Sequence, residues 1–101
     1  MNMVTRKRIE ILADAPLLPR LIDALSASGI AGHTVLPVLA GEGSTGRWSE
    51  DRLTGTGKLV VMAIASADHA AALADRLAPL LDSHRLLLML SEVEVIRGDR
   101  F

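Results

Sequence analysis

The residues of this chain that could do chemistry gather in a glycine-rich polar stretch between positions 41 and 58. Gly41, Gly43 and Gly46 form the pattern G-x-G-x-x-G, in which bare backbone amides can approach phosphate groups. In a dinucleotide-binding domain this pattern opens a helix inside a parallel βαβ unit. Residues 47–57 carry no helical apolar stripe, so we predict a glycine-rich loop here, either flexible or in contact with an anion.

The end of the same stretch contains part of a phosphate-binding P-loop, Gly55-Thr56-Gly57-Lys58. The complete motif requires glycine at position 52 and serine or threonine at position 59. This chain has Arg52 and Leu59 there, so the motif fails.

The sequence contains no group of residues with the types and spacing that metal binding or acid–base catalysis requires. His33, His69 and His84 fall on different predicted elements without metal-ligand spacing, as surface or turn histidines do. Glu50 and Asp51 are adjacent in the loop, where nothing gives the two carboxylates distinct environments. The chain has no cysteine, which removes thiol nucleophiles and disulfides. We therefore expect no enzyme, no catalytic residue, no metal site and no cofactor.

Arginine and tryptophan side chains in and beyond the loop are candidates for recognition. Arg47 and Trp48 are residue types that dominate interface hot spots, so we assign them to partner binding, the alternative being that Trp48 folds back onto its own domain. Arg85, Arg97 and Arg100 flank the last predicted strand. They are either solvated strand-end charges or, together with the glycine loop, an anion cradle across a subunit interface.

Hydrophobic periodicity predicts the elements that would position these residues. In chain order we expect a strand at 7–13, a helix with its apolar stripe at 17–25, a strand at 34–40, the loop at 41–57, a strand at 59–65, a helix beginning near 66–68 and a strand at 85–96. Pro79 should end or kink the second helix. The order predicts an α+β, ferredoxin-like βαββαβ fold, a four-stranded antiparallel sheet with two helices on one face.

The second, third and fourth predicted strands are apolar on both faces, although two helices can cover only one of them. Burying each large apolar side chain stabilises the fold by about 2 kcal/mol, so leaving the second face in water would be a large loss. We therefore expect a homo-oligomer that packs sheet against sheet. Pro37 within the strand at 34–40 indicates an edge position or a bulge.

The overall composition limits which partners and which cellular compartment are expected. A chain of 101 residues with a hydrophobic half predicts one domain. A net charge of −1 leaves no basic excess for a nucleic-acid backbone. The amino-terminal stretch is not a signal peptide and no apolar run is long enough for a membrane span, so we expect a cytoplasmic protein without membrane insertion.

The runs Gly29–Val35 (GIAGHTV) and Val93–Gly98 (VEVIRG), together with Gly41 and Gly43, resemble the PII signalling-protein superfamily. The stretch TVLPVLAGEGSTGRW is most similar to the PII-like branch associated with carboxysomes and bicarbonate transport. The resemblance implies that residues 1–101 are a single PII-like domain that forms a homotrimer with nucleotide sites between subunits. It also implies that residues 41–57 are the T-loop between strands two and three, which changes shape with the bound nucleotide and docks a partner.

The resemblance carries over residue by residue to an adenine pocket and the loop base. Thr34 would contact the adenine and Ile64 would form part of the pocket wall. Gly41 and Gly43 would form the T-loop base near the phosphates.

The remaining transferred positions are charged or polar. Arg85 stands where the family's phosphate-binding B-loop has a lysine, with Asp82 and Ser83 in the same loop. Arg97 and Arg100 would reach the phosphates from the neighbouring subunit.

Two residue types of the nitrogen-regulating members are missing. The chain has no tyrosine, so a T-loop tyrosine cannot be uridylylated, and no glutamine, which in those members helps to bind magnesium-ATP and 2-oxoglutarate. What remains suits a non-enzymatic sensor of ADP or AMP, with bicarbonate as a second ligand. Its protein partner would be a bicarbonate transporter or a carboxysome component.

Other function classes stay open. On the same fold, the chain could be a CutA-like trimeric metal-binding protein, a nitrogen-regulatory PII protein sensing ATP and ADP, a slow nucleotide hydrolase, or a purely structural oligomer that binds no nucleotide.

Overall fold

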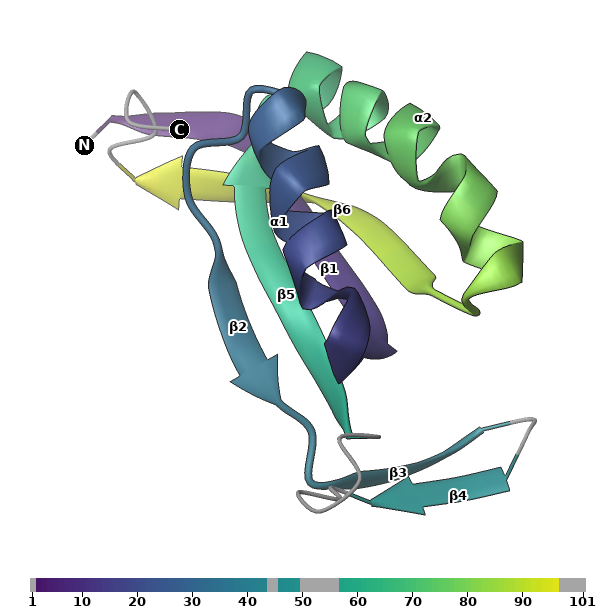
Figure 1. Ribbon diagram of the computed structural model, residues 1–101. Helices are drawn as coiled ribbons and strands as arrows, with labels where there is room; N and C mark the ends of the chain where they lie inside the picture. Colours follow the sequence, from purple (N-terminus) through teal and green to yellow (C-terminus); the bar gives the residue numbers. More distant parts are fainter. Residues whose placement is uncertain (1, 44–45, 50–56, 97–101) are drawn as a thin grey trace.

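The computed structural model of the chain describes residues 2–43, 46–49 and 57–96 (Figure 1). The elements are β1 (Met3–Asp14), the short 3-10 helix η1 (Ala15–Leu17), α1 (Leu18–Ala27), β2 (Thr34–Pro37), β3 (Ala40–Gly43), β4 (Gly46–Ser49), β5 (Lys58–Ala65), α2 (Ala67–Ser83) and β6 (Leu87–Ile96). The predicted order of strands and helices is confirmed.

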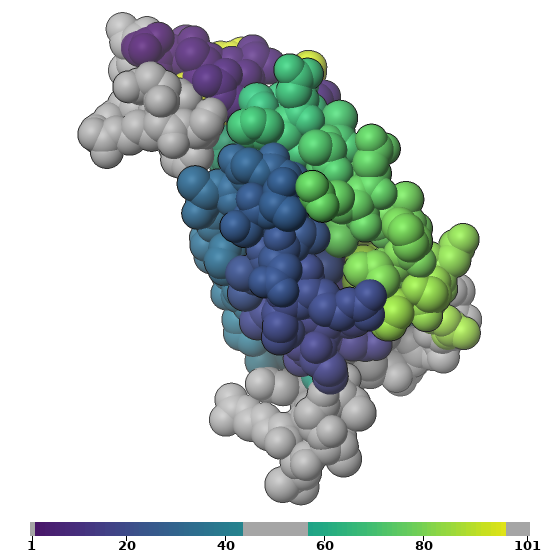
Figure 2. Space-filling view, turned by 45° about the horizontal axis from the view of Figure 1, so that its top comes forward, coloured from purple at the N-terminus to yellow at the C-terminus, as the bar shows by residue number. Residues whose placement is uncertain are grey.

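One antiparallel sheet forms the centre of the fold, in the strand order β2-β5-β1-β6. Figure 1 shows α1 and α2 together on one side of this sheet, and Figure 2 shows them side by side. This is the predicted ferredoxin-like arrangement. Because β2 is an outer strand, the expectation that Pro37 lies at a sheet edge is confirmed.

The hydrophobic core lies between the helices and the face of the sheet that they cover. Strand β5 alternates strictly between buried and half-buried residues, as expected for a strand with one face on the core. Ile9 and Ile11 of β1 are fully buried with Val61 of β5, and Leu21 and Leu73 close the core from the two helices. Burial of these positions fixes the register, because a shift by one residue would turn each strand's apolar set outward.

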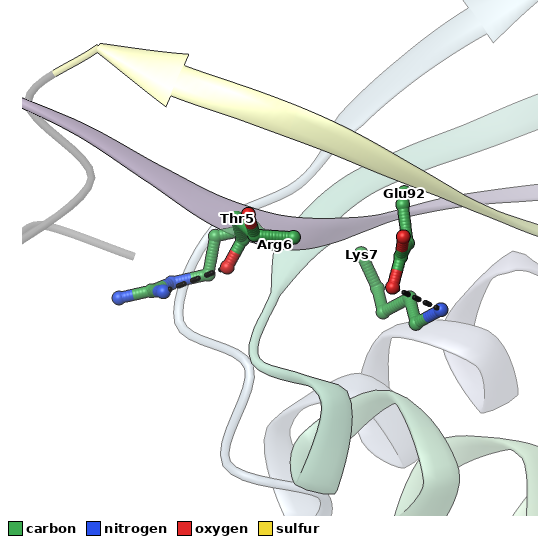
Figure 3. A network of polar contacts seen from close by, with 4 residues as sticks. All are labelled: Thr5, Arg6, Lys7 and Glu92. Carbon is green, nitrogen blue, oxygen red and sulfur yellow. Dashed lines mark hydrogen bonds and ion pairs between the residues drawn. The ribbon is translucent and has the colours of Figure 1, made fainter.

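The longest pairing is that of β1 with β6, which runs from Met3 opposite Ile96 to Leu12 opposite Leu87. Near the middle of this pairing the Lys7 Nζ lies 3.6 Å from Glu92 Oε1 across the two strands, and Arg6 Nη1 donates to the carbonyl of Thr5 at 2.9 Å (Figure 3). The Lys7–Glu92 contact follows the cross-strand register, whereas the Arg6 contact joins two neighbours within β1. Both contribute little free energy by themselves.

The start of α2 and the end of α1 carry the residue types that commonly begin and end helices. The Ser66 hydroxyl accepts from the backbone N–H of His69 at 3.1 Å and caps the start of α2. Gly29 follows α1 with φ +82°, a left-handed conformation that glycine adopts without strain.

Pro79 does not end the second helix, because α2 continues to Ser83. The alternative, a kink at Pro79, stays a prediction. Proline removes one N–H, whose acceptor would be the carbonyl of Asp75 one turn earlier. Leu77 is buried and Leu80 packs against the core, so tertiary contacts on both sides of Pro79 hold the helix together. Asp82 and Ser83, expected in a loop, therefore lie in the last turn of α2.

The stretch 41–57, expected to lack regular structure, contains part of a hairpin. Strands β3 and β4 pair with Gly41 opposite Trp48, Glu42 opposite Arg47 and Gly43 opposite Gly46. Figure 1 shows this hairpin beyond the end of the sheet at which β2 ends, away from the helices. The prediction of an irregular loop is wrong for these residues.

The face of the sheet opposite the helices is largely apolar. Leu36 pairs with Val60, Leu87 with Leu12, and Met89 with Glu10, so these side chains share that face. Leu36, Leu87 and Met89 are each nearly half exposed. We call this surface, with Met62 and Ile64, the open face.

Among the described residues no helix is both long and apolar enough to cross a membrane.

Candidate functional site

A mainly apolar hollow of about 300 Å³ lies beside the start of β2. It is lined by Gly32, His33, Thr34, Met62, Ala63 and Ile64. Thr34 pairs with Met62 across β2 and β5, and Ile64 follows two residues later on the same face. The sheet register thus brings the two predicted adenine contacts, Thr34 and Ile64, into one hollow.

The chemistry of this hollow suits a flat aromatic ring. Methionine and isoleucine side chains supply apolar contact area, while a hydroxyl and an imidazole supply a few polar groups for its edge. His33 is exposed before the start of β2, as its sequence context indicated, and it also lines this hollow. Its place directly before Thr34 was the signal that could have identified it.

The glycine-rich stretch leaves and rejoins the sheet at a defined base. The N–H of Val38 donates to the carbonyl of Lys58 at 3.2 Å, and the N–H of Ala15 donates to the carbonyl of Gly57 at 2.8 Å. The Lys58 Nζ lies 2.7 Å from Asp14 Oδ1. Since Asp14 is half exposed, this ion pair stabilises the fold by less than about 1 kcal/mol. The ion pair nevertheless holds the Lys58 ammonium group at the point where the glycine-rich stretch rejoins the sheet.

Lys58 was missed as a candidate because its partner lies 44 residues away in the sequence. Gly41 and Gly43 are in β3, on the outgoing side of the same base. Arg47 and Trp48, the partner-binding candidates, belong to β4.

A second group of candidates lies where α2 ends. The Ser83 hydroxyl contacts the carbonyl of Pro79 at 2.9 Å and His84 Nδ1 at 2.8 Å. Arg85 follows with an exposed side chain and φ +51°, a left-handed conformation that is rare for residues other than glycine. Such conformations persist where surrounding structure enforces them, and they gather at functional sites.

These two groups lie toward opposite edges of the sheet. Thr34 begins β2, one outer strand, whereas Arg85 precedes β6, the other. With strands about 4.8 Å apart, β2 and β6 are separated by on the order of 14 Å. Thr34 and Arg85 of one protomer therefore lie near opposite edges of the sheet and do not share the hollow.

Arg97 and Arg100, the other phosphate candidates, lie outside the described residues. Among residues 2–43, 46–49 and 57–96, no group of three or more histidine, aspartate or glutamate side chains is placed to hold a metal ion.

Solved structures with the same fold include PII-like proteins. One is CPII from Thiomonas intermedia K12, a nitrogen regulatory PII-like protein bound to ADP, AMP and bicarbonate, with a TM-score of 0.90 at 20% identity over 99% of this chain and 96% of that one. A PII-like signalling protein from Thermus thermophilus has a TM-score of 0.80 at 25% identity, covering 100% of this chain and 99% of the other. The GlnK–ATP complex of B. subtilis has a TM-score of 0.58 at 16% identity over 88% and 82% of the two chains.

No curated protein sequence matches the chain. The sequence profile of the family described as nitrogen regulatory protein P-II matches residues 6–100. That match spans nearly the whole chain, so the predicted resemblance is confirmed. The expectation that the chain is not an enzyme is confirmed with it, because this is a family of signalling proteins. The chain belongs to the nitrogen regulatory protein P-II family and is a PII-like signalling protein.

Proposed function

We propose that this PII-like protein senses ADP and AMP in clefts between its subunits, with bicarbonate as a second ligand. The observation that carries the proposal is the hollow around Thr34 and Ile64. Its apolar walls and few polar groups fit an adenine ring, and its distance from Arg85 fits a nucleotide whose phosphates reach a second subunit. ADP, AMP and bicarbonate in the CPII structure from Thiomonas support the choice of ligands.

The assembly in this proposal is a homotrimer of one PII-like domain, residues 1–101. The open face supports it, since several large apolar side chains there are nearly half exposed in the protomer. In the trimer, Thr34 and Ile64 of one subunit bind the base. Gly41 and Gly43 lie near the phosphates, with Ser83, Arg85, Arg97 and Arg100 providing hydroxyl and guanidinium donors.

Signalling in this proposal runs through the T-loop, residues 41–57. A ligand changes the loop only if it binds one loop conformation better than another. The hairpin of β3 and β4 provides an element that can be held or released, and Arg47 and Trp48 within it would contact the partner. We place the partner in inorganic-carbon metabolism, as a bicarbonate transporter or a carboxysome component, and the sensor in the cytoplasm with its nucleotides.

Calorimetric titration tests the proposal directly. ADP, AMP, ATP and cyclic AMP are titrated into wild-type protein with and without bicarbonate. Thr34→Val removes the hydroxyl with little change of shape, so we expect about tenfold weaker ADP binding from the loss of one buried hydrogen bond. Arg97→Ala should weaken ADP more than adenosine.

Thr5→Val is the matched control, because Thr5 lies in β1 outside the hollow. Absence of heat from every nucleotide would exclude the sensor and leave the metal-binding or structural alternatives. A strong preference for ATP would favour the nitrogen-regulatory alternative.

A further inference from the structure

The end of α2 is tied to α1 by a chain of three polar contacts. Ser83 Oγ lies 2.9 Å from the carbonyl oxygen of Pro79 and 2.8 Å from His84 Nδ1. On the other side of the imidazole, Arg20 Nη1 lies 3.5 Å from His84 Nε2. Arg20 belongs to α1, so these contacts connect the two helices at this end of the fold.

Only one arrangement of hydrogens satisfies all three contacts. A guanidinium can only donate, so His84 Nε2 accepts from Arg20. The proton of a neutral imidazole then resides on Nδ1 and is donated to Ser83 Oγ. The Ser83 hydroxyl in turn donates to the carbonyl of Pro79. Hydrogen bonds in such a chain polarise one another in the same sense, which favours a single orientation of the imidazole.

Arg85 is held from both sides by this arrangement. The N–H of His84 donates to the carbonyl of Leu80 at 3.0 Å, which continues the helical bonding up to the residue before Arg85. On the other side, Leu86 is only 8% exposed and belongs to the core. Arg85 lies between these two anchors with φ +51°. Its backbone is therefore oriented by its neighbours, although its own side chain is exposed.

The end of a helix is electrostatically the wrong place for a phosphate. Carbonyl groups at a helix C-terminus carry a partial negative charge and attract cations. Here one of these carbonyls, that of Pro79, is occupied by the Ser83 hydroxyl, and Arg20 adds a cation beside His84. Both features reduce the repulsion that an anion near Arg85 would meet.

We propose that Arg20 is a positioning residue of the nucleotide site. Through His84 and Ser83 it keeps the end of α2 in the conformation from which Arg85 reaches a phosphate. The inference rests on the proposed nucleotide binding and deepens it. It assigns a role to a residue of α1 that would not contact the nucleotide itself.

Arg76 offers a matched control. Arg20 and Arg76 line the same open groove of about 480 Å³ between α1 and α2, and both side chains are exposed. Arg76 makes no hydrogen bond or ion pair within the described part of the chain. Replacing either arginine by alanine removes the same charge from the same groove, but only Arg20→Ala removes the contact with His84.

The test is a double-mutant cycle measured by calorimetric titration of ADP and of adenosine. We expect Arg20→Ala to weaken ADP binding three- to tenfold, the range for losing an oriented charged contact, and to leave adenosine binding unchanged. Arg76→Ala should change ADP binding less than twofold. In an Arg85→Ala background, Arg20→Ala should have no further effect on ADP binding, because its influence passes through Arg85.

Each outcome separates the alternatives. Equal weakening by Arg20→Ala with and without Arg85 would mean that Arg20 acts on the phosphate by its own charge, and the positioning role would be rejected. Equal losses from Arg20→Ala and Arg76→Ala would also reject it. ADP binding that neither Arg20→Ala nor Arg85→Ala changes overturns the inference but not the proposed function, whereas no nucleotide binding by the wild type overturns both.

Discussion

At the scale of single residues, Arg85 shows a conflict between stability and recognition. A left-handed conformation costs a residue with a side chain roughly 1–2 kcal/mol compared with the right-handed one. Glycine would avoid most of this cost. That an arginine occupies the position, with φ +51°, is explained if its guanidinium binds an anion.

Arg85→Gly should therefore stabilise the fold and weaken the proposed nucleotide site at once. We expect the free energy of unfolding to exceed that of Arg85→Ala by about 1 kcal/mol, because alanine keeps the strained conformation. Both variants should bind ADP about tenfold more weakly than wild type. Urea unfolding at one protomer concentration and titration of ADP measure the two effects. Equal stability of the two variants would contradict the strain argument, and unchanged ADP binding would remove Arg85 from the site.

Single residues of the site differ in how far the sequence could predict them. Thr34 and Ile64 could be named in advance because the resemblance to the PII superfamily implies adenine contacts at these positions, while hydrophobic patterns predicted only the strands that contain them. Lys58 could not be predicted, because its position is defined by the ion pair with Asp14. The pairing of β1 with β5 brings these two residues together, and no local sequence pattern indicates it. His33 is exposed as expected, and the sequence could not place it in the hollow because a polar residue before a strand fits many roles.

At the scale of elements, α2 positions Arg85 and is itself defined by its two ends. Its start is capped by Ser66, whose hydroxyl satisfies one of the amide groups left free in the first turn. Its other end extends past Pro79 to Ser83. The sequence predicted the start correctly, since capping is local, and missed the end, since packing of Leu77 and Leu80 overrides the local effect of proline.

Removing the cap should cost a measurable part of the stability. We expect Ser66→Ala to lower the free energy of unfolding by about 1 kcal/mol, because the N–H of His69 loses its acceptor. Ser26→Ala is the control: Ser26 is an exposed residue within α1, where alanine has the higher helix propensity. Thermal or urea unfolding distinguishes them. A Ser66→Ala variant as stable as wild type would show that the cap contributes nothing beyond water.

The hairpin of β3 and β4 is the element that the sequence did not reveal. Strands of four residues that contain two glycines, as β3 does, give no alternating pattern. Hydrophobic periodicity therefore could not predict them. A weakly specified hairpin is suited to a segment whose conformation a ligand must change, since low local stability is where such motions arise.

At the scale of the whole molecule, the open face links assembly to binding. The sequence predicted this face, because strands apolar on both sides need more cover than two helices provide. Within the protomer Leu36, Leu87 and Met89 remain nearly half exposed. Near them in the central strand, the Arg8 Nε lies 3.1 Å from Glu10 Oε1. Stacking sheets would remove the apolar side chains from water and would bury this pair with them.

A charge introduced on the open face should separate the subunits without unfolding them. Met89 is 47% exposed in the protomer and lies opposite Glu10, so Met89→Asp places a second carboxylate beside an existing one. In the assembled state both carboxylates would be desolvated, which costs several kcal/mol, whereas in the free protomer the new group stays hydrated. We expect sedimentation to show a trimer for wild type and a folded monomer for Met89→Asp.

The same variant decides whether the nucleotide site is shared between subunits. Ala71→Asp is the control, because Ala71 is exposed on α2, on the helical side of the fold. It introduces the same charge away from the open face and should leave the trimer and its ADP affinity intact. If Thr34 and Arg85 act on one nucleotide from different subunits, the Met89→Asp monomer should lose most of its ADP affinity although the hollow around Thr34 is unchanged. If the monomer binds ADP as tightly as wild type, one protomer alone supplies all contacts to the nucleotide. Residues of the same chain would then bind the phosphates in place of Arg85 from a second subunit.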